Sequence, residues 1–250
     1  MMQRSGGAAL ILLWVQVAAA QMAPLHVLAS NGVKAGIEAL KPACESALGR
    51  TLTVNYDSSA GLKRKIEGGE AFDLAIVTPE TTADLVKSGK LADGTATDLA
   101  RTGIGFGIRA GAPKPDIATA EAVKQTLLKA KSIALVREGA SRATIEKIFE
   151  RLGIAQAMAS KVKLESGTEK AGEGVAKGET ELEMVPISEI SLVPGVQILG
   201  PLPDELQSYV RFQISLSANT HEGTTAKKTI ACLTSPVGLS VFKAYAKDPQ

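Results

Sequence analysis

Small polar residues follow three predicted strands in the first third of the chain, each at the start of a predicted helix. They are Ser30-Asn31, Ser58-Ser59 and Thr78. Hydroxyl groups can hydrogen-bond an anion, and the first backbone N–H groups of a helix have no partner within the helix. Because ligands bind beyond the carboxyl ends of parallel strands, these donors are expected to converge there. The pattern predicts an uncharged cradle for a small anion, although Ser, Thr and Asn also serve simply as helix caps.

The second half of the chain offers two comparable strand ends. Ala140-Ser141 follows a predicted strand at 132–137, and Ile187-Ser188 closes a predicted strand at 181–187. Ser141 is expected to cap the helix that follows it. These residues are candidates for the opposite wall of the anion site.

Two arginines, Arg137 and Arg142, flank the turn that contains Ala140 and Ser141. A guanidinium group could bind a carboxylate through two parallel hydrogen bonds. Glu138 and Glu146 lie close by in sequence, so a solvated surface charge is the simpler interpretation of both arginines. An arginine directed toward the ligand edge would favour an organic carboxylate over an inorganic oxyanion.

Residues that could support catalysis are few and scattered. His26 and His221 stand apart from any Cys, Asp or Glu at metal-ligand spacing, so we predict no metal site and no cofactor. The glycines at 103, 105 and 107 lie inside a predicted strand, without the helix that a dinucleotide fingerprint requires. Asp73 precedes a buried strand, where a structural hydrogen bond is expected. The sequence predicts a binding protein rather than an enzyme; an exported hydrolase would need a histidine beside a serine hydroxyl.

The N-terminus has the pattern of a secretory signal peptide. Arg4 precedes an apolar run at 8–20, which ends in three alanines before Gln21. The run has about 13 residues, fewer than the ~20 that a membrane-spanning helix needs. We therefore predict a signal peptide at 1–20, cleavage near Ala20 and a mature protein that lies outside the cytoplasm.

Composition narrows the classes of partner. Hydrophobic residues make up 45% of the chain and charged residues 22%, as in an ordinary globular protein. The formal net charge of +2 is far from the basic character of a nucleic-acid-binding protein. Aromatic residues are only 4%, which leaves few stacking surfaces for a large sugar or a base. We expect a monomer that binds a small molecule and no nucleic acid.

Two cysteines, Cys44 and Cys232, fall on predicted helices near opposite ends of the chain. An oxidising compartment would permit a disulfide between them. Two separate buried thiols are the simpler interpretation, because sequence gives no Cα separation.

Strands and helices alternate along the chain, which predicts an α/β fold with parallel strands and right-handed crossovers. The predicted strands lie at 25–30, 51–57, 73–78, 99–109, 132–137, 181–187, 196–199 and 208–218. The predicted helices lie at 32–48, 61–69, from 79 onward, around 123–130, 145–152, 168–178, 222–234 and 237–247. Long strands interrupt this alternation near 100–107 and 210–216, where the chain is expected to cross between two lobes. Lobe I is predicted to contain 24–102 and 213–250, and lobe II 103–212.

Taken together, these features resemble the periplasmic molybdate-binding proteins of ABC importers, and more closely a divergent branch of that family. The similarity covers 25–245, and its most specific block is SSAGLKRKIEGGEAFDLAIVTPE at 58–80. Further resembling segments are LHVLASNGVKAGIEALKPA, LARTGIGFGIRAGAPKPDI, ISEI and VPGVQILGPLP. The resemblance implies a two-lobed class II periplasmic binding fold that closes on a tetrahedral oxyanion. It also implies a periplasmic location for the mature protein and a membrane permease as partner.

The family's ligand contacts can be carried over to particular positions. The first serine position falls on Ser30 or Asn31, the second on Ser59 and the third-strand contact on Thr78. The contacts of lobe II fall nearest Ala140 and Ser141.

Lobe II departs from the family at two places. The proline-containing turn is replaced by GASRA, and the family's tyrosine has no counterpart at Pro186-Ile187-Ser188. Loss of a hydrogen bond to a charged ligand removes about 1.5–3 kcal/mol. The leading prediction is a binding protein for a molybdate- or tungstate-like oxyanion, and the alternative is a binding or sensor protein for a small organic carboxylate.

Overall fold

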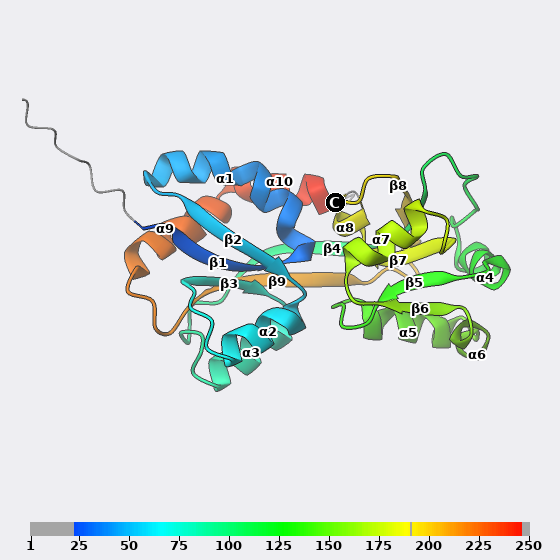
Figure 1. Cartoon of the computed structure of the whole chain (residues 1–250), viewed down its shortest axis with the longest axis horizontal. Coiled ribbons are helices and arrows are strands. Elements are labelled where there is room, and N and C mark those ends of the chain that lie inside the picture. The colour runs from blue at the N-terminus through cyan, green and yellow to red at the C-terminus, as the bar shows by residue number, and fades with distance from the viewer. Residues whose placement is uncertain (1–22, 191, 247–250) are drawn as a thin grey trace, which may run out of the picture.

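The computed structural model describes residues 23–190 and 192–246. The molecule is elongated, with two α/β lobes arranged along its longest axis (Figure 1). The predicted signal peptide at 1–20 lies outside the described residues. Within the described ranges, no helix combines the length and the apolar character needed to cross a membrane.

Nine strands form one continuous sheet. They are β1 (Leu25–Ser30), β2 (Leu52–Asp57), β3 (Leu74–Val77), β4 (Thr97–Arg109), β5 (Ile133–Val136), β6 (Val162–Glu165), β7 (Leu182–Pro186), β8 (Val196–Pro201) and β9 (Tyr209–Leu216). The strand order is β2-β1-β3-β9-β4-β7-β5-β6, with β8 paired to β4. Pairing is parallel within β1–β3 and within β5–β7, and antiparallel wherever β4 or β9 takes part. The predicted α/β class is confirmed.

One 3-10 helix and ten α-helices connect these strands in the described part of the chain. In lobe I they are η1 (Asn31–Val33), α1 (Lys34–Leu48), α2 (Ser59–Glu67), α3 (Pro79–Lys87), α9 (Gly223–Leu233) and α10 (Pro236–Ala246). In lobe II they are α4 (Ala120–Lys129), α5 (Arg142–Arg151), α6 (Ala155–Ala159), α7 (Thr168–Ala176) and α8 (Ile187–Ile190). The sequence prediction missed α6 and β6, because both are short and β6 lacks an apolar alternation.

The long strand β4 joins the two lobes. Its first half, Thr97–Gly103, pairs with β9 of lobe I, and from Ile104 onward it pairs with β7 of lobe II. The chain returns to lobe I between Pro201, which pairs with β4, and Tyr209, which begins β9. This return precedes the stretch 210–216 expected from the sequence.

The alternating glycines of β4 make room for residues packed against one of its faces. A Cβ atom on Gly105 would lie 2.7 Å from Cγ1 of Ile187, and one on Gly107 would lie 2.4 Å from Oε1 of Glu183. A Cβ atom on Gly103 would meet the Gln207 amide at 3.0 Å. The alternating glycines therefore allow neighbouring side chains to pack closely against β4, the strand that joins the lobes.

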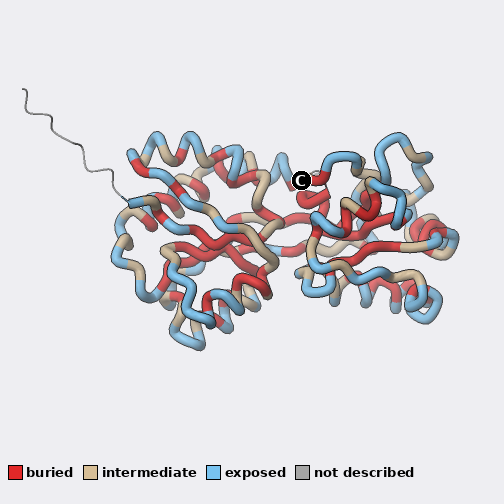
Figure 2. Tube along the Cα trace, in the orientation of Figure 1, coloured by how far each residue is buried: buried red, intermediate tan, exposed pale blue. Residues whose placement is uncertain are grey.

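Helices cover both faces of the sheet in each lobe. In lobe I, α1, α9 and α10 lie on one face, and α2 and α3 lie on the other (Figure 1). In lobe II, α4, α5 and α6 cover a face built on Ile104, Phe106 and Met184. The buried residues accordingly concentrate along the strands (Figure 2).

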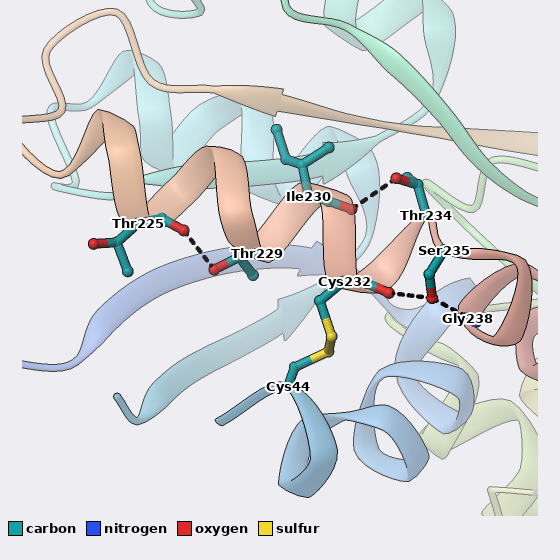
Figure 3. Close-up of a disulfide and its surroundings, with 8 residues drawn as sticks. All are labelled: Cys44, Thr225, Thr229, Ile230, Cys232, Thr234, Ser235 and Gly238. Carbon is teal, nitrogen blue, oxygen red and sulfur yellow. Dashed lines mark hydrogen bonds between the residues drawn. A yellow bond between two sulfur atoms is a disulfide. The ribbon is translucent and has the colours of Figure 1, made fainter. Parts of the chain in front are cut away.

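A disulfide joins α1 to α9 within lobe I (Figure 3). The Cα atoms of Cys44 and Cys232 are 5.9 Å apart, and 188 residues separate them in sequence. The simpler interpretation of two separate thiols is therefore wrong. Only tertiary packing, which places both helices on the same face of the sheet, brings the two cysteines together.

Candidate anion-binding site

Three residues predicted from separate strand ends meet at the carboxyl edge of lobe I. The Ser59 hydroxyl donates to the Ser30 hydroxyl at 3.2 Å, and the Thr78 backbone N–H donates to the Ser59 hydroxyl at 3.3 Å. All three residues are buried. We call Ser30, Ser59 and Thr78 the hydroxyl cluster. It contains no charged side chain, as the sequence pattern predicted.

Helix caps hold this cluster in place. Ser58 caps α2 by accepting the Gly61 N–H at 3.0 Å, which leaves the next residue, Ser59, to face Ser30. Thr78 caps α3 by accepting the Thr81 N–H at 3.5 Å. Ser30 makes no side-chain cap bond to η1. Capping therefore accounts for Ser58, but does not account for the contact between Ser30 and Ser59.

The half-buried Asn31 begins η1, whose position depends on a glycine. A Cβ atom on Gly32 would lie 2.3 Å from the Phe212 ring of β9, so η1 can approach the sheet only without a side chain there. This close approach keeps Asn31 beside Ser30 at the carboxyl end of β1.

The ligand-contacting residues predicted in lobe II differ in their exposure to solvent. Ser141 is buried, and its side chain makes no cap bond to α5, so the predicted capping role is wrong. Its backbone has helical angles (φ −84°, ψ −12°), whereas a capping residue is usually extended. Ala140 is exposed. The Ile187 side chain is buried and packs against Gly105, so only its backbone is available to a ligand.

Among the described residues, hydrogen bonds of Ser188 and two ion pairs connect the lobes. The Ser188 hydroxyl donates to the Gly32 carbonyl at 2.9 Å. Arg64 of α2 pairs with Glu138 of lobe II at 2.6 Å, and Lys34 of α1 pairs with Glu169 of α7 at 3.7 Å. In both ion pairs the cation comes from lobe I and the carboxylate from lobe II. Separating the lobes would therefore break both ion pairs and leave these two cations on the lobe that carries the hydroxyl cluster.

Neither arginine near Ser141 is directed at the cluster. Arg142 binds Glu146 on its own helix through Nε at 2.9 Å and Nη2 at 2.5 Å. The exposed Arg137 donates to the Leu164 carbonyl at 3.4 Å. The interpretation of both as surface charges is confirmed.

Sequence reasoning missed two buried carboxyl groups in lobe II. Glu183 of β7 has no hydrogen-bond partner for either carboxyl oxygen, and burial together with the charge of Glu189 raises its pKa to about 8. Glu189 of α8 accepts a hydrogen bond from the Thr168 hydroxyl; burial raises its pKa to about 7, although that bond opposes the shift. The sequence does carry one signal that could have revealed Glu183, because this glutamate lies inside the apolar run from Leu182 to Val185.

The sequence also singled out Asp73, His26 and His221 as residues that could support catalysis. Asp73 accepts hydrogen bonds from the His26 backbone N–H at 2.9 Å and the Thr220 hydroxyl at 2.6 Å, which confirms its structural role. Among residues 23–190 and 192–246, no hydrogen bond joins His26 or His221 to a serine hydroxyl, as a hydrolase would require. The same residues contain no cluster of His, Cys, Asp and Glu that could hold a metal ion.

The chain matches known proteins over nearly its full length. Residues 25–245 match the family of bacterial extracellular solute-binding proteins. An aconitate isomerase from Pseudomonas sp. is 31% identical over 235 residues, which cover 92% of this chain and 89% of that protein.

Solved structures share the fold at low sequence identity. The periplasmic molybdate-binding protein of Azotobacter vinelandii matches with a TM-score of 0.75 and 16% identity, over 88% of this chain and 97% of that one. The sulfate-binding protein SubI of Mycobacterium tuberculosis matches with a TM-score of 0.70 and 18% identity, over 90% of this chain and 88% of that one.

Proposed function

Because this chain belongs to the bacterial extracellular solute-binding proteins, we propose that it captures a small anion between its two lobes outside the cytoplasm. The hydroxyl cluster is the part of the site that lobe I supplies. The backbone and hydroxyl of Ser141 and the backbone of Ile187 are the matching donors of lobe II. Closure is a hinge motion about β4 and the return segment that precedes β9.

The meeting of Ser30, Ser59 and Thr78 is the observation that carries this proposal. Ser59 is buried beside both other residues, and its hydrogen bonds to them are long, at 3.2 and 3.3 Å. An anion can replace these contacts with shorter, charge-assisted bonds from the same hydroxyl and N–H groups. Helix N-termini at α2 and α3 add partial positive charge at the same edge.

We favour an unsaturated polycarboxylate, aconitate being the example, as the ligand class. The supporting observation is the 31% identity to an aconitate isomerase over nearly the whole chain. The lobe II wall agrees with this choice, because the tyrosine of molybdate binders has no counterpart at Pro186-Ile187-Ser188. The cations Lys34 and Arg64, which lobe opening would release, would attract a ligand with several negative charges.

A molybdate- or tungstate-like oxyanion is the second candidate. It is favoured by the uncharged character of the hydroxyl cluster and by the shared fold with molybdate- and sulfate-binding proteins. Such an ion needs many neutral donors and no counter-charge.

The proposal includes delivery of the ligand to the membrane permease of an ABC importer. Release from the signal peptide near Ala20 would place the mature chain in the periplasm, as a monomer. The disulfide between Cys44 and Cys232 agrees with an oxidising compartment.

Thermal-shift and calorimetric titrations test the ligand class. The panel contains cis-aconitate, trans-aconitate, citrate, molybdate, tungstate, sulfate and phosphate. We expect the aconitates to raise the melting temperature most, following the stabilisation RT ln(1 + [L]/Kd). A response to molybdate and tungstate alone would replace the favoured ligand with the second candidate. No response to any anion would overturn the proposed function.

A pair of cap variants separates binding from stability. Thr78→Ala and Thr119→Ala each remove a threonine that caps a helix, but Thr119 caps α4 at the outer end of lobe II (Figure 1). Both should lose about 1 kcal/mol of stability. Only Thr78→Ala should also weaken ligand binding, by about 10-fold or more, because a bond to a charged group contributes about 1.5–3 kcal/mol. Equal affinities in the two variants would remove Thr78 from the site.

A further inference from the structure

The short helix α8 lies where the two lobes meet. It follows β7 at the carboxyl edge of lobe II and packs against η1 and α1 of lobe I. Ser188 fixes it there, since its backbone N–H donates to the Thr102 hydroxyl at 3.3 Å and its own hydroxyl donates to the Gly32 carbonyl. Gly32 is two residues beyond Ser30 of the hydroxyl cluster. Helix α8 therefore lies next to the ligand edge of lobe I, and opening of the lobes would separate Ser188 from Gly32.

Glu189, the next residue in α8, carries a buried carboxyl group without a counter-ion in the described structure. Glu189 is 8% exposed, and its carboxyl group accepts a hydrogen bond from the hydroxyl of Thr168, the first residue of α7. Nearby, Lys34 and Glu169 form an ion pair with each other and not with Glu189. The other buried carboxyl group of this region is Glu183 of β7, whose pKa the charge of Glu189 helps to raise.

Such a carboxyl group exchanges its proton near neutral pH. Burial raises the pKa of Glu189 to about 7, and the Thr168 hydrogen bond keeps it from rising further. A general acid or base works best when its pKa lies near the operating pH. Glu189 can therefore both accept and return a proton at pH 7.

An unsaturated tricarboxylate offers a reaction that needs only this exchange. A base removes a proton from the CH2 group next to a carboxylate, and the electron pair spreads over the three-carbon unit. The same proton then returns to the carbon at the far end of the former double bond. One C–H bond breaks and one forms, the double bond shifts, and the product can have the opposite cis or trans configuration. No oxidant or reductant takes part.

We propose that this chain isomerises an unsaturated tricarboxylate by such an allylic proton shift, with Glu189 transferring the proton and Thr168 positioning its carboxyl group. The inference rests on the polycarboxylate form of the proposed function. Glu183 is excluded from the role because it lies in β7 against Gly107, inside lobe II.

The test uses the mature chain with cis-aconitate at pH 7 and measures formation of the trans isomer by proton NMR. The wild type should convert the substrate. Glu189→Gln should lower the rate by about 100-fold or more, the usual contribution of a positioned acid–base group. It should still show a thermal shift with cis-aconitate, which demonstrates a folded, ligand-binding protein. Glu183→Gln, the matched change at the other buried carboxyl, should retain the wild-type rate.

A pH profile separates the positioning role of Thr168 from a structural one. Because the Thr168 hydroxyl lowers the pKa of Glu189, Thr168→Val should move the midpoint of the rate profile to higher pH. A lower rate with an unchanged midpoint would assign Thr168 a structural role only.

The outcomes distinguish this inference from the proposed function. Binding of cis-aconitate by the wild type without conversion would overturn the isomerase activity and leave anion capture standing. Conversion by Glu189→Gln at the wild-type rate would overturn the assignment of Glu189. Failure of the wild type to bind any anion of the panel would instead overturn the proposed function.

Discussion

The two lobes share an α/β architecture but treat their polar interior differently. In lobe I, Arg50 is buried and pairs with Glu222 at 2.6 Å, Asp73 is hydrogen-bonded by two groups, and a disulfide joins α1 to α9. In lobe II, Glu183 is buried with no hydrogen-bond partner, and Glu189 has only a hydroxyl.

This difference indicates a division of labour. Burial of an unpaired carboxyl costs free energy, and natural proteins retain such groups chiefly where they serve a function. Lobe I is stabilised covalently and by paired charges, so it is suited to hold the hydroxyl cluster rigidly. Lobe II keeps protonatable groups, one of them beside the ligand edge. We therefore expect lobe II, which in the described part of the chain buries carboxyl groups without counter-ions, to supply the acid–base chemistry.

The largest expected effect comes from the disulfide. Replacing both Cys44 and Cys232 with serine should lower stability by about 2–5 kcal/mol, since the bond closes a long loop in the unfolded chain. Chemical denaturation with hydrogen exchange checks this, and the loss of protection should concentrate in α1 and α9. Wild type under reducing conditions provides the control. A uniform loss across both lobes would contradict the view that the bond stabilises lobe I in particular.

A smaller effect is expected from the strand that links the lobes. Gly105→Ala should cost about 1–3 kcal/mol, because its Cβ atom would lie 2.7 Å from Ile187 and 2.8 Å from the Gly200 carbonyl oxygen. Urea denaturation measures the change. Gly223→Ala is the control, as a Cβ atom there meets nothing within 4 Å. A neutral result for Gly105→Ala would show that α8 is loosely packed on β4.

The buried carboxyl groups of lobe II predict that the free energy of unfolding depends on pH. Glu183 has an ordinary pKa of 4.5 when unfolded and about 8 when folded, so between these values the folded state holds the extra proton. Stability should therefore fall as pH rises through this window and level off above it. Each group that differs by a full proton contributes about 1.4 kcal/mol per pH unit.

Glu183→Gln should flatten this dependence, most clearly near pH 8, where Glu189 has already lost most of its proton. Denaturation midpoints measured at intervals from pH 5 to 9 provide the comparison. An equally steep fall in the variant would place the responsible group elsewhere.

Much of the fold follows from local pattern. The apolar strands, the glycine at 49 that ends α1 with φ +63°, and the proline at 79 that starts α3 all lie where the sequence predicted. Ser30, Ser59 and Thr78 could also be expected together, since parallel strands must end at one edge. In contrast, β6 was missed because the residues Val162–Glu165 are held by pairing with β5 and not by an apolar pattern.

The amino-acid sequence by itself determined the α/β class, the two rounds of strand and helix, and the strand-end hydroxyls, because these depend on periodicity and on residues next to one another. Only the tertiary structure decided the Cys44–Cys232 bond, the packing of Ile187 on Gly105, and the burial of Glu189 beside Thr168. Each of these joins residues from different elements. Whether a cysteine has a partner, or a carboxyl keeps its proton, depends on which element packs against it and excludes water.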